Sequence, residues 1–397
     1  MSAVRVDRIP VRISVRISVL ALGLAWGSAL SFVGACGGAD DADEIQNPPR
    51  DQYETWLKVE PPGVVCGNNS PFKFFANFSD KSDNLVVVFE PGGACWDYDS
   101  CTGKNGIRGA ANVNGLPDDH WRLAPLISPF LSRFDEESPS REWNMIYVPY
   151  CTGDVHTGNR VVTYSSAGSP DVTFHHQGNA AVQQVVAWLD QSFTHVPKLL
   201  VTGCSAGGVG SLVNYRLLRN GIRAVEKSYL LDDSGPVFPS SGYSAPLHAM
   251  IRAAWDLDSL RDQMPPGFSP DDMGTINTAI ADEFPGDRLA TTYFRRDYNF
   301  SLYSYERFYN FPAKSEILRM WDADTQLLMQ QYATRDNLYY FLPYYRNVND
   351  SHCTTVLNFA GSNIEERDMT LGQWVNDFVN DRPIESMIEA PVPGEDL

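Results

Sequence analysis

A serine stands between two glycines in the segment Gly203-Cys-Ser-Ala-Gly207, directly after an apolar run and directly before a stretch with helical spacing. In a sharp turn from strand to helix, the corner residue is held in strained backbone angles, and glycines two positions away remove side chains that would collide there. The hydroxyl group of Ser205 would then stand exposed above the sheet. The N–H group of Ala206 would begin the helix, where unpaired N–H groups and the helix dipole favour negative charge. The pattern predicts the nucleophile of a hydrolase, and an ordinary glycine-rich turn is the alternative.

A serine nucleophile needs a base within hydrogen-bonding reach and an acid that orients the base. In α/β-hydrolases these residues follow in the chain order Ser, then Asp or Glu, then His. Two histidines, His248 and His352, come after Ser205. We expect His352 to be the base, because it falls in a loop after the last predicted strand, whereas His248 falls in a less regular segment.

The acid should leave the end of a strand shortly before that histidine. We expect residues 316–321 to form such a strand, and Asp322 follows them directly. Asp324, two residues further on, is the alternative acid. Asp232 and Asp233 end another predicted strand and form a rival position, because some hydrolases place the acid one strand earlier.

A second glycine-rich turn, Gly92-Gly-Ala94, also follows an apolar run. Its backbone N–H groups can approach a ligand closely, because glycine has no side chain. We therefore expect Gly92, Gly93 and Ala206 to form an oxyanion hole. The sequence contains no HExxH motif, phosphate loop or dinucleotide fingerprint, so we expect neither a metal nor another cofactor.

These residues need a scaffold, and the chain alternates short apolar segments with segments of helical spacing. The predicted strands are 84–90, 143–149, 198–202 and 228–232, and the predicted helices between and after them are 178–193 and 209–219. Such alternation predicts crossover connections and a mainly parallel sheet covered on both faces. The fold class is therefore α/β, of the α/β-hydrolase type, in which ligands bind beyond the carboxyl ends of the strands.

Residues 236–312 lack this alternation and are rich in Pro, Met and aromatic residues. We expect them to form a helical or irregular insertion near the active site, with apolar side chains that line an acyl or sugar pocket. A packed outer layer of helices is the alternative. A last helix is predicted at 371–379, and we expect residues 56–397 to form a single domain.

The N-terminus has the pattern of an export signal, in which arginines precede the uncharged apolar stretch 17–32. Val33-Gly-Ala-Cys36 resembles a bacterial lipobox. We therefore expect residues 1–35 to be a removed signal peptide and Cys36 to carry lipid that anchors the protein in the cell envelope, at the outer membrane or cell surface. A freely secreted or periplasmic protein is the alternative, and a single membrane-spanning anchor is less consistent with so short a stretch.

Residues 36–55 are polar, acidic and interrupted by prolines, which predicts a flexible tether. The full chain of 397 residues has a formal net charge of −18, and removal of residues 1–35 makes this charge more negative. Such a charge argues against a nucleic-acid partner and against electrostatic binding to an anionic membrane, so the membrane would be reached only through the N-terminal lipid. We expect a monomer that acts on a neutral ester.

Seven cysteines in an exported chain suggest disulfides. Cys95 and Cys101 are close enough to close one short loop, and Cys66 with Cys151 is the next choice. Cys204 and Cys353 are left over, and each adjoins a predicted catalytic residue. For this last pair, a disulfide and two buried free thiols both stay open.

Several of these segments form a series of recognisable blocks. In chain order they are Cys66-Gly-Asn-Asn-Ser-Pro71, Gly92-Gly-Ala-Cys95 with Cys101, Trp143-Asn-Met-Ile-Tyr-Val-Pro-Tyr-Cys-Thr-Gly-Asp154, Gly203-Cys-Ser-Ala-Gly-Gly208 and Asp233-Ser-Gly235. Together they resemble the pectin acetylesterase family, which includes plant pectin acetylesterases and the animal carboxylesterase Notum. The resemblance spans about Cys66 to His352 and implies an α/β-hydrolase that cleaves carboxylic esters without a metal.

The resemblance implies the same nucleophile and base, and an acid that follows an aromatic residue at a strand end, which favours Asp322 after Trp321. It also implies the same oxyanion hole and the disulfides Cys66–Cys151 and Cys95–Cys101. Two positions differ from the family pattern. Ala94 stands where an aromatic residue is usual, and the spacing from Asp322 to Gln326 is one residue longer, which keeps Asp324 as an alternative.

The sequence therefore predicts an exported serine carboxylesterase, above all an O-acetylesterase that removes acyl groups from a polysaccharide. The resemblance leaves the substrate open, because the family acts on acetylated polysaccharide and on a lipidated protein. A lipase or deacylase for longer acyl chains or acylated protein is the first alternative, and a peptidase on the same scaffold is related to it. A non-catalytic surface-binding lipoprotein is the second.

Overall fold

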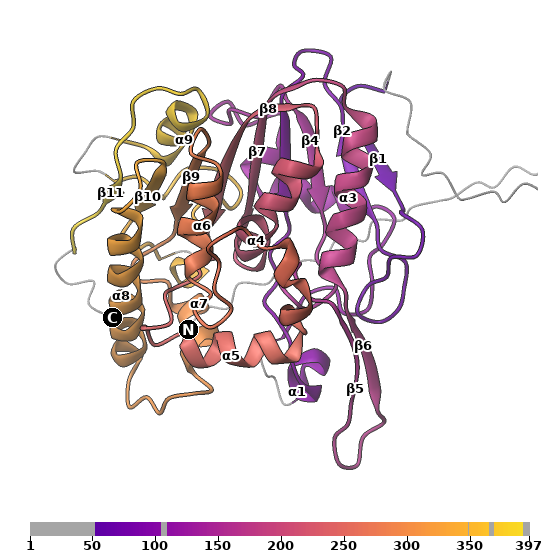
Figure 1. The fold of residues 1–397 in the computed structure, drawn as a ribbon, viewed down its shortest axis with the longest axis vertical. Coiled ribbons are helices and arrows are strands. Elements are labelled where there is room, and N and C mark those ends of the chain that lie inside the picture. The colour runs from indigo at the N-terminus through magenta and orange to yellow at the C-terminus, as the bar shows by residue number, and fades with distance from the viewer. Residues whose placement is uncertain (1–51, 105–108, 348, 365–368, 392–397) are drawn as a thin grey trace, which may run out of the picture. The chain divides into compact units, whose positions relative to one another are not determined.

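The computed structural model describes residues 52–104, 109–347, 349–364 and 369–391 (Figure 1). The predicted signal peptide at 1–35, the lipidation candidate Cys36 and most of the tether at 36–55 lie outside these residues. Within them, no helix combines the length and the apolar character that crossing a membrane requires.

A central sheet organises the fold, with the strand order β1-β2-β4-β3-β7-β8-β9-β10-β11. Its strands are β1 (Trp56–Val59), β2 (Phe74–Asn77), β3 (Leu85–Phe89), β4 (Asn144–Val148), β7 (Val196–Cys204), β8 (Val225–Asp233), β9 (Arg288–Thr292), β10 (Leu338–Leu342) and β11 (Met387–Ile388). Only β2 is antiparallel to its neighbours β1 and β4 among the pairs of the described sheet, and the pairs from β4 to β11 are parallel. Strands β5 (Arg160–Tyr164) and β6 (Val172–His176) form a separate antiparallel hairpin that projects from one end of the sheet (Figure 1).

Helices cover both faces of the sheet because successive strand residues point to opposite sides. Val87 of β3 belongs to one apolar cluster, together with helices α3 (Gly178–Ser192), α4 (Ala206–Gly221), α6 (Thr275–Glu283) and α8 (Lys314–Tyr332). Its neighbours Val86 and Val88 belong to a second cluster, together with α9 (Leu371–Val379) and the short helix η3 (Pro129–Leu131). A strand buried on both faces reads as a continuous apolar run, which is why β3 and β4 were recognisable in the sequence.

The predicted α/β architecture is confirmed. The four predicted strands correspond to β3, β4, β7 and β8, and the predicted helices correspond to α3, α4 and α9. Helix α4 begins at Ala206, three residues before the apolar spacing starts, because the glycines of its first turn pack against the sheet. The shorter helices of the described chain are α1 (Tyr98–Thr102), η2 (His120–Leu123), α2 (Ala124–Ile127), α5 (Ala245–Ala254), η4 (Leu257–Gln263), α7 (Tyr298–Tyr305) and η5 (Asn349–Ser351).

Two predicted elements are wrong. Residues 316–321 are not a strand but part of helix α8, in which Ile317, Met320 and Trp321 are buried at helical spacing on the sheet. The segment 236–312 is not a continuous insertion, because it contains the sheet strand β9. Residues 289–292 of β9 are all buried, but small Ala and Thr side chains among them give neither alternation nor a strong apolar run.

Candidate active site

The turn around Ser205 has the strained geometry that the sequence predicts. Ser205 has φ 57° and ψ −120° between the end of β7 and the start of α4, a conformation that is costly for a residue with a side chain. A Cβ atom on Gly207 would lie 2.1 Å from the carbonyl oxygen of Phe89, and one on Gly203 would lie 2.6 Å from the same atom. Glycine at both positions therefore lets β3 pack directly against the turn.

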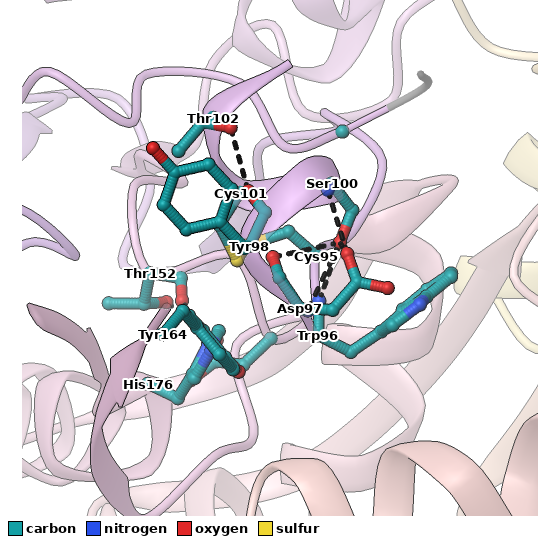
Figure 2. Close-up of a disulfide and its surroundings, with 12 residues drawn as sticks. Cys95, Trp96, Asp97, Tyr98, Ser100, Cys101, Thr102, Thr152, Tyr164 and His176 are labelled. Atoms are coloured by element: carbon teal, nitrogen blue, oxygen red, sulfur yellow. Dashed lines mark hydrogen bonds between the residues drawn. A yellow bond between two sulfur atoms is a disulfide. The ribbon is translucent and has the colours of Figure 1, made fainter. Parts of the chain in front are cut away.

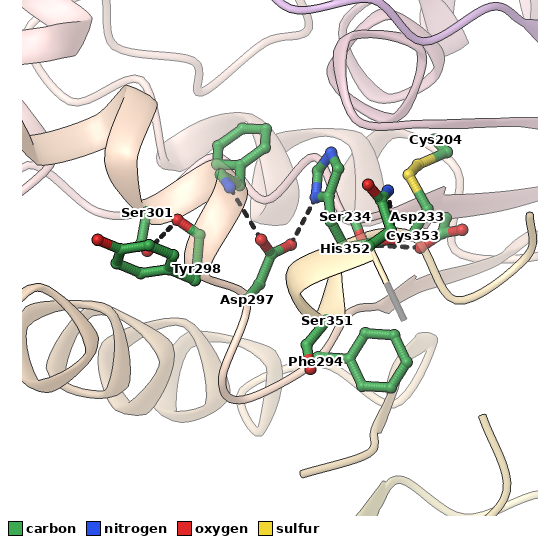
Figure 3. A network of polar contacts seen from close by, with 12 residues as sticks. Cys204, Asp233, Ser234, Phe294, Asp297, Tyr298, Ser301, Ser351, His352 and Cys353 are labelled. Atoms are coloured by element: carbon green, nitrogen blue, oxygen red, sulfur yellow. Dashed lines mark hydrogen bonds and ion pairs between the residues drawn. A yellow bond between two sulfur atoms is a disulfide. The ribbon is translucent and has the colours of Figure 1, made fainter. Parts of the chain in front are cut away.

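His352 is paired with an acid, and the acid is Asp297 (Figure 3). Nδ1 of His352 lies 2.8 Å from Oδ2 of Asp297. The Asp297 carboxylate is also the N-cap of α7, where Oδ1 accepts the N–H of Phe300 at 2.8 Å. Asp297 is fully buried. Burial raises the pKa of Asp297, and the neighbouring His352 opposes that rise. This pair can hold the imidazole in one tautomer, with the Nδ1–H donating to the carboxylate.

The expected contact of Asp322 or Asp324 with His352 is wrong. Both residues lie on helix α8 rather than at a strand end. Asp322 pairs with Arg295, with Oδ1 and Nη2 3.0 Å apart. Asp324 accepts the N–H groups of Tyr243 and Ser244 at 2.7 and 2.9 Å and the hydroxyl group of Tyr305 at 3.0 Å.

Asp297 was missed because the strand before it was not recognised. It follows β9 by five residues and precedes His352, which satisfies the chain order Ser, Asp, His. The usable signal was the β-prone run Leu289-Ala-Thr-Thr-Tyr-Phe294 shortly before an aspartate. Because residues 236–312 were interpreted as an insertion, the run at 289–294 was not predicted to be a strand.

The rival acid Asp233 does not contact His352 as the acid of a triad would, but holds neighbouring segments of the site by hydrogen bonds. Its carboxylate accepts the backbone N–H and hydroxyl groups of Thr354 and Thr355 at 2.7 to 3.0 Å, and the hydroxyl group of Ser234 at 2.9 Å. Its backbone oxygen accepts the N–H of Ser205 at 2.8 Å. Asp233 therefore connects the turn of the nucleophile to the loop that follows His352. The neighbouring Asp232 is buried against it, and burial together with the charge of Asp233 raises the pKa of Asp232.

His248, the alternative base, is on α5 and lines an apolar cavity next to Ser205. Its Nδ1 atom is buried without a hydrogen-bond partner among the described residues. Burial lowers the pKa of His248 to about 4, so the ring is neutral near pH 7. Among the described residues, no carboxylate is hydrogen-bonded to Nδ1 of this ring, whereas Asp297 is bonded to Nδ1 of His352.

Ser205 and His352 line one cleft of about 400 Å³. Gly92 and Gly93 line the same cleft, and Ala206, directly after Ser205, begins helix α4. Gly93 has φ 70°, and a Cβ atom there would lie 2.3 Å from both the backbone oxygen of Gly109 and the hydroxyl oxygen of Tyr303. The structure thus brings the residues predicted for the oxyanion hole to the nucleophile.

The turn at residues 91–93 is held by a buried carboxylate that the sequence did not single out. Glu90 accepts the N–H of Tyr150 at 2.6 Å and the side-chain amide of Asn112 at 3.2 Å. Its other oxygen lies 2.8 Å from Nε2 of His120. Because these partners come from three separate segments, Glu90 fixes the position of the turn relative to the sheet.

A smaller apolar cavity of about 70 Å³ also adjoins Ser205. Helix α5 and the segments that follow β3 and β4 supply walls of this cavity, which include Ala94, Trp96, Val155, Leu247, Ile251 and Trp255. Ala94, which stands where the family usually has an aromatic residue, is one of these wall residues. Such a cavity fits the acyl part of an ester, because apolar surface is removed from water when the group binds.

Three disulfides connect the described chain: Cys66–Cys151, Cys95–Cys101 and Cys204–Cys353. The first two confirm the expected pairs, and the third decides the question that the sequence left open. Figure 2 shows Cys95–Cys101 beside the capping box of α1, in which Asp97 accepts the N–H of Ser100 at 2.8 Å. The backbone oxygen of Cys95 accepts the indole N–H of Trp255 at 2.9 Å, which fixes one wall of the apolar cavity.

The family model described as pectinacetylesterase matches residues 52–268, more than half of the chain. The chain belongs to the pectinacetylesterase family. The matched region contains Ser205, Gly92 and Gly93, whereas Asp297 and His352 lie beyond it. Membership therefore supports the predicted nucleophile turn, and the geometry of the other two residues comes from the fold.

Curated relatives agree with this membership over part of their length. The palmitoleoyl-protein carboxylesterase NOTUM of Mus musculus is 30% identical over 156 residues, which are 38% of this chain and 28% of that protein. The Drosophila melanogaster protein of the same name is 26% identical over 208 residues, or 49% of this chain and 30% of that protein. The matched regions thus span less than a third of these relatives.

The fold matches solved structures over a longer stretch. The Wnt deacylase Notum from Drosophila, in crystal form II, has a TM-score of 0.58 at 17% sequence identity, and the match covers 85% of this chain and 97% of that one. Crystal form I of the same protein gives a TM-score of 0.56. At this level of identity the comparison confirms the α/β-hydrolase-like fold.

Proposed function

We propose that this protein is a serine carboxylesterase with the triad Ser205, His352 and Asp297. The observation that carries the proposal is the His352–Asp297 pair at 2.8 Å, in the loop that lines the same cleft as the strained Ser205. Family membership supports an ester as the substrate. A glycine-rich turn without chemistry would need neither the strained serine nor a fully buried acid at the histidine.

The mechanism follows from the order of contacts. Asp297 accepts the Nδ1–H of His352, so Nε2 is free of a proton and can take the one on Ser205 as its oxygen attacks the ester carbonyl. The carbonyl oxygen becomes negative against the N–H groups of Gly93 and Ala206. His352 then returns the proton to the departing alcohol oxygen. A water molecule repeats the sequence on the acyl-enzyme and releases the carboxylic acid.

We propose an O-acyl polysaccharide, with acetyl as the acyl group, as the substrate class. The apolar cavity of about 70 Å³ suits a short acyl group. The cleft of about 400 Å³, which also reaches Ser205, carries Asn299 and Asn349 and suits the polar alcohol part of the ester. The acidic chain, with its net charge of −18, favours a neutral ester over a de-esterified anionic polymer.

A deacylase for longer acyl chains is the second candidate, because a second apolar cavity adjoins the acyl cavity. A further apolar cavity of about 50 Å³ shares Val155, Val209, Ile251 and Trp255 with it. Movement of these shared side chains would join the two spaces into one channel. The relatives named palmitoleoyl-protein carboxylesterases are consistent with this candidate.

We also propose that the protein is exported and anchored by a lipid on Cys36, with a freely secreted or periplasmic form as the alternative. Three disulfides support an oxidising compartment. Mass spectrometry of the mature N-terminus distinguishes the two forms, because a diacylated Cys36 is heavier than a free N-terminus by the mass of its lipid.

Hydrolysis of 4-nitrophenyl esters from acetate to palmitate, with wild-type protein and Ser205→Ala, tests the proposal. We expect kcat/KM to be highest for acetate or propionate and to fall with chain length. We expect Ser205→Ala to lose at least about 10⁴-fold in kcat. Near-normal activity of Ser205→Ala would reject the triad, and a maximum at eight or more carbons would favour the deacylase. Release of acetate from an acetylated pectin or xylan then separates glycan specificity from general esterase activity.

A further inference from the structure

We propose that the Cys204–Cys353 disulfide positions the catalytic base, so that full turnover requires this bond to be oxidised. The inference rests on the proposed function. Cys204 directly precedes Ser205 and Cys353 directly follows His352, although 149 positions separate the two cysteines in the chain. A ring nitrogen of His352 and the two sulfur atoms all lie within 4.8 Å of one another. The disulfide thus links the peptide units next to the nucleophile and next to the base (Figure 3).

The loop of His352 needs such a link because its backbone is unfavourable. Asn349, Asp350, Ser351 and Cys353 have φ angles of 49°, 53°, 55° and 68°, in the left-handed region that residues with side chains avoid. Loops in this state persist only when their surroundings hold them. Without the contacts that hold it, the loop of His352 would relax toward negative φ angles and displace the imidazole.

Hydrogen bonds hold the ring of His352 to Asp297 and hold both sides of its loop, and the disulfide adds a covalent link to these contacts. Before His352, the hydroxyl group of Ser351 donates to the backbone oxygen of Arg346 at 2.7 Å. After it, the N–H of Cys353 donates to the hydroxyl oxygen of Ser234 at 3.1 Å. These contacts tie the loop to itself and to the end of β8. The disulfide alone joins it covalently to the nucleophile turn, where a displacement of about 1 Å can cost about 10²-fold in rate.

The same disulfide is the one that a reductant in the cleft can reach. Cys353 is partly exposed and lines the catalytic cleft, whereas Cys204 is 3% exposed. All four cysteines of the other two disulfides are buried. A dithiol would attack Sγ of Cys353 as its thiolate, and Cys204 would leave as a thiolate and take up a proton. The second thiol of the reagent then displaces Cys353, so the reagent becomes a cyclic disulfide and the enzyme holds two thiols.

The test compares Cys204→Ser/Cys353→Ser with the control Cys66→Ser/Cys151→Ser. Kinetics on 4-nitrophenyl acetate are run below the unfolding temperature of each variant, as found by circular dichroism. We expect the first variant to lose about 10- to 100-fold in kcat with KM within about twofold. We expect the control to keep kcat within about twofold even where its Tm falls. A Cys204→Ser/Cys353→Ser variant that keeps wild-type kcat would overturn the proposal.

If the Cys204→Ser/Cys353→Ser variant does not fold, a second measurement tests the proposal on the wild-type enzyme. Wild-type enzyme is titrated with a dithiol, and samples taken at intervals are alkylated and mapped by mass spectrometry. We expect kcat to fall in step with alkylation of Cys204 and Cys353, before the other four cysteines react, and to return on reoxidation. Full activity after these two thiols have appeared would overturn the proposal. Failure of the proposed function is a separate result, seen as retained activity in Ser205→Ala, and it would remove this inference too.

Discussion

Replacing Asp297 by Asn tests the triad most sharply, because it changes charge and hydrogen-bond polarity while it keeps size. Oδ2 of Asp297 lies 2.8 Å from Nδ1 of His352. An amide N–H at that position would donate to Nδ1, so the proton of the neutral imidazole would move to Nε2. That nitrogen could then no longer accept the proton of Ser205.

The size of the loss follows from the burial of the pair. Asp297 has no exposed side-chain surface and His352 only 8%, so water cannot replace the carboxylate charge that stabilises the imidazolium. The equivalent change in a well-studied serine protease lowers kcat by about 10⁴-fold, or about 5 kcal/mol. We expect a loss of that order. The N-cap bond from Phe300 can persist on the remaining oxygen, so the fold should survive.

Asp322→Asn is the matched control, because Asp322 was the acid that the sequence favoured. Its side chain is 31% exposed and paired with Arg295, which predicts a kcat within about twofold of wild type. The assay is steady-state hydrolysis of 4-nitrophenyl acetate, with Tm recorded for both variants. If Asp297→Asn kept more than a tenth of wild-type kcat, or Asp322→Asn lost as much as Asp297→Asn, the assignment of Asp297 would be refuted.

Two further predictions concern the oxyanion turn and the buried histidine His248. Gly93→Ala should lower kcat by about 10²- to 10³-fold, because its Cβ would lie 2.3 Å from Gly109 and Tyr303. Gly168→Ala is the control, since Gly168 also has positive φ, at 74°, but no atom within 4 Å of the added Cβ; equal losses in both variants would show that backbone strain, and not the site, is responsible. The second prediction concerns pH. Burial lowers the pKa of His248 from 6.5 to about 4, so the unfolded chain binds a proton there that the folded chain does not, and this residue destabilises the fold as the pH falls through that window. Between pH 6.5 and 4, the free energy of unfolding of His248→Leu relative to wild type should therefore rise by up to about 3 kcal/mol, measured by urea denaturation; a difference independent of pH would contradict the burial argument. Comparing the two proteins cancels the opposite contributions of Asp232 and Asp297, whose pKa values are raised.

Segments whose structure depends on local pattern were the ones that could be predicted. The strands β3 and β4 are buried on both faces and read as apolar runs, and the helices α3 and α4 show apolar residues at helical spacing. Prediction failed where the local pattern was weak or ambiguous. The apolar residues of 316–321 fit a strand as well as one side of a helix, and β9 is too rich in small residues to stand out.

By itself, the sequence determined the strained serine turn, the glycine turn opposite it and the histidine that follows both. Each depends on residue types within a few positions, such as the glycines at 203 and 207 that let Phe89 lie against the turn. Only the tertiary structure decided which acid meets His352 and whether Cys204 joins Cys353. These partners lie 55 and 149 positions apart. Their contact is set by the strand order of the sheet, which places β9 beside β8 and the loops after these strands at the same edge. Residue spacing within a short segment cannot predict that order.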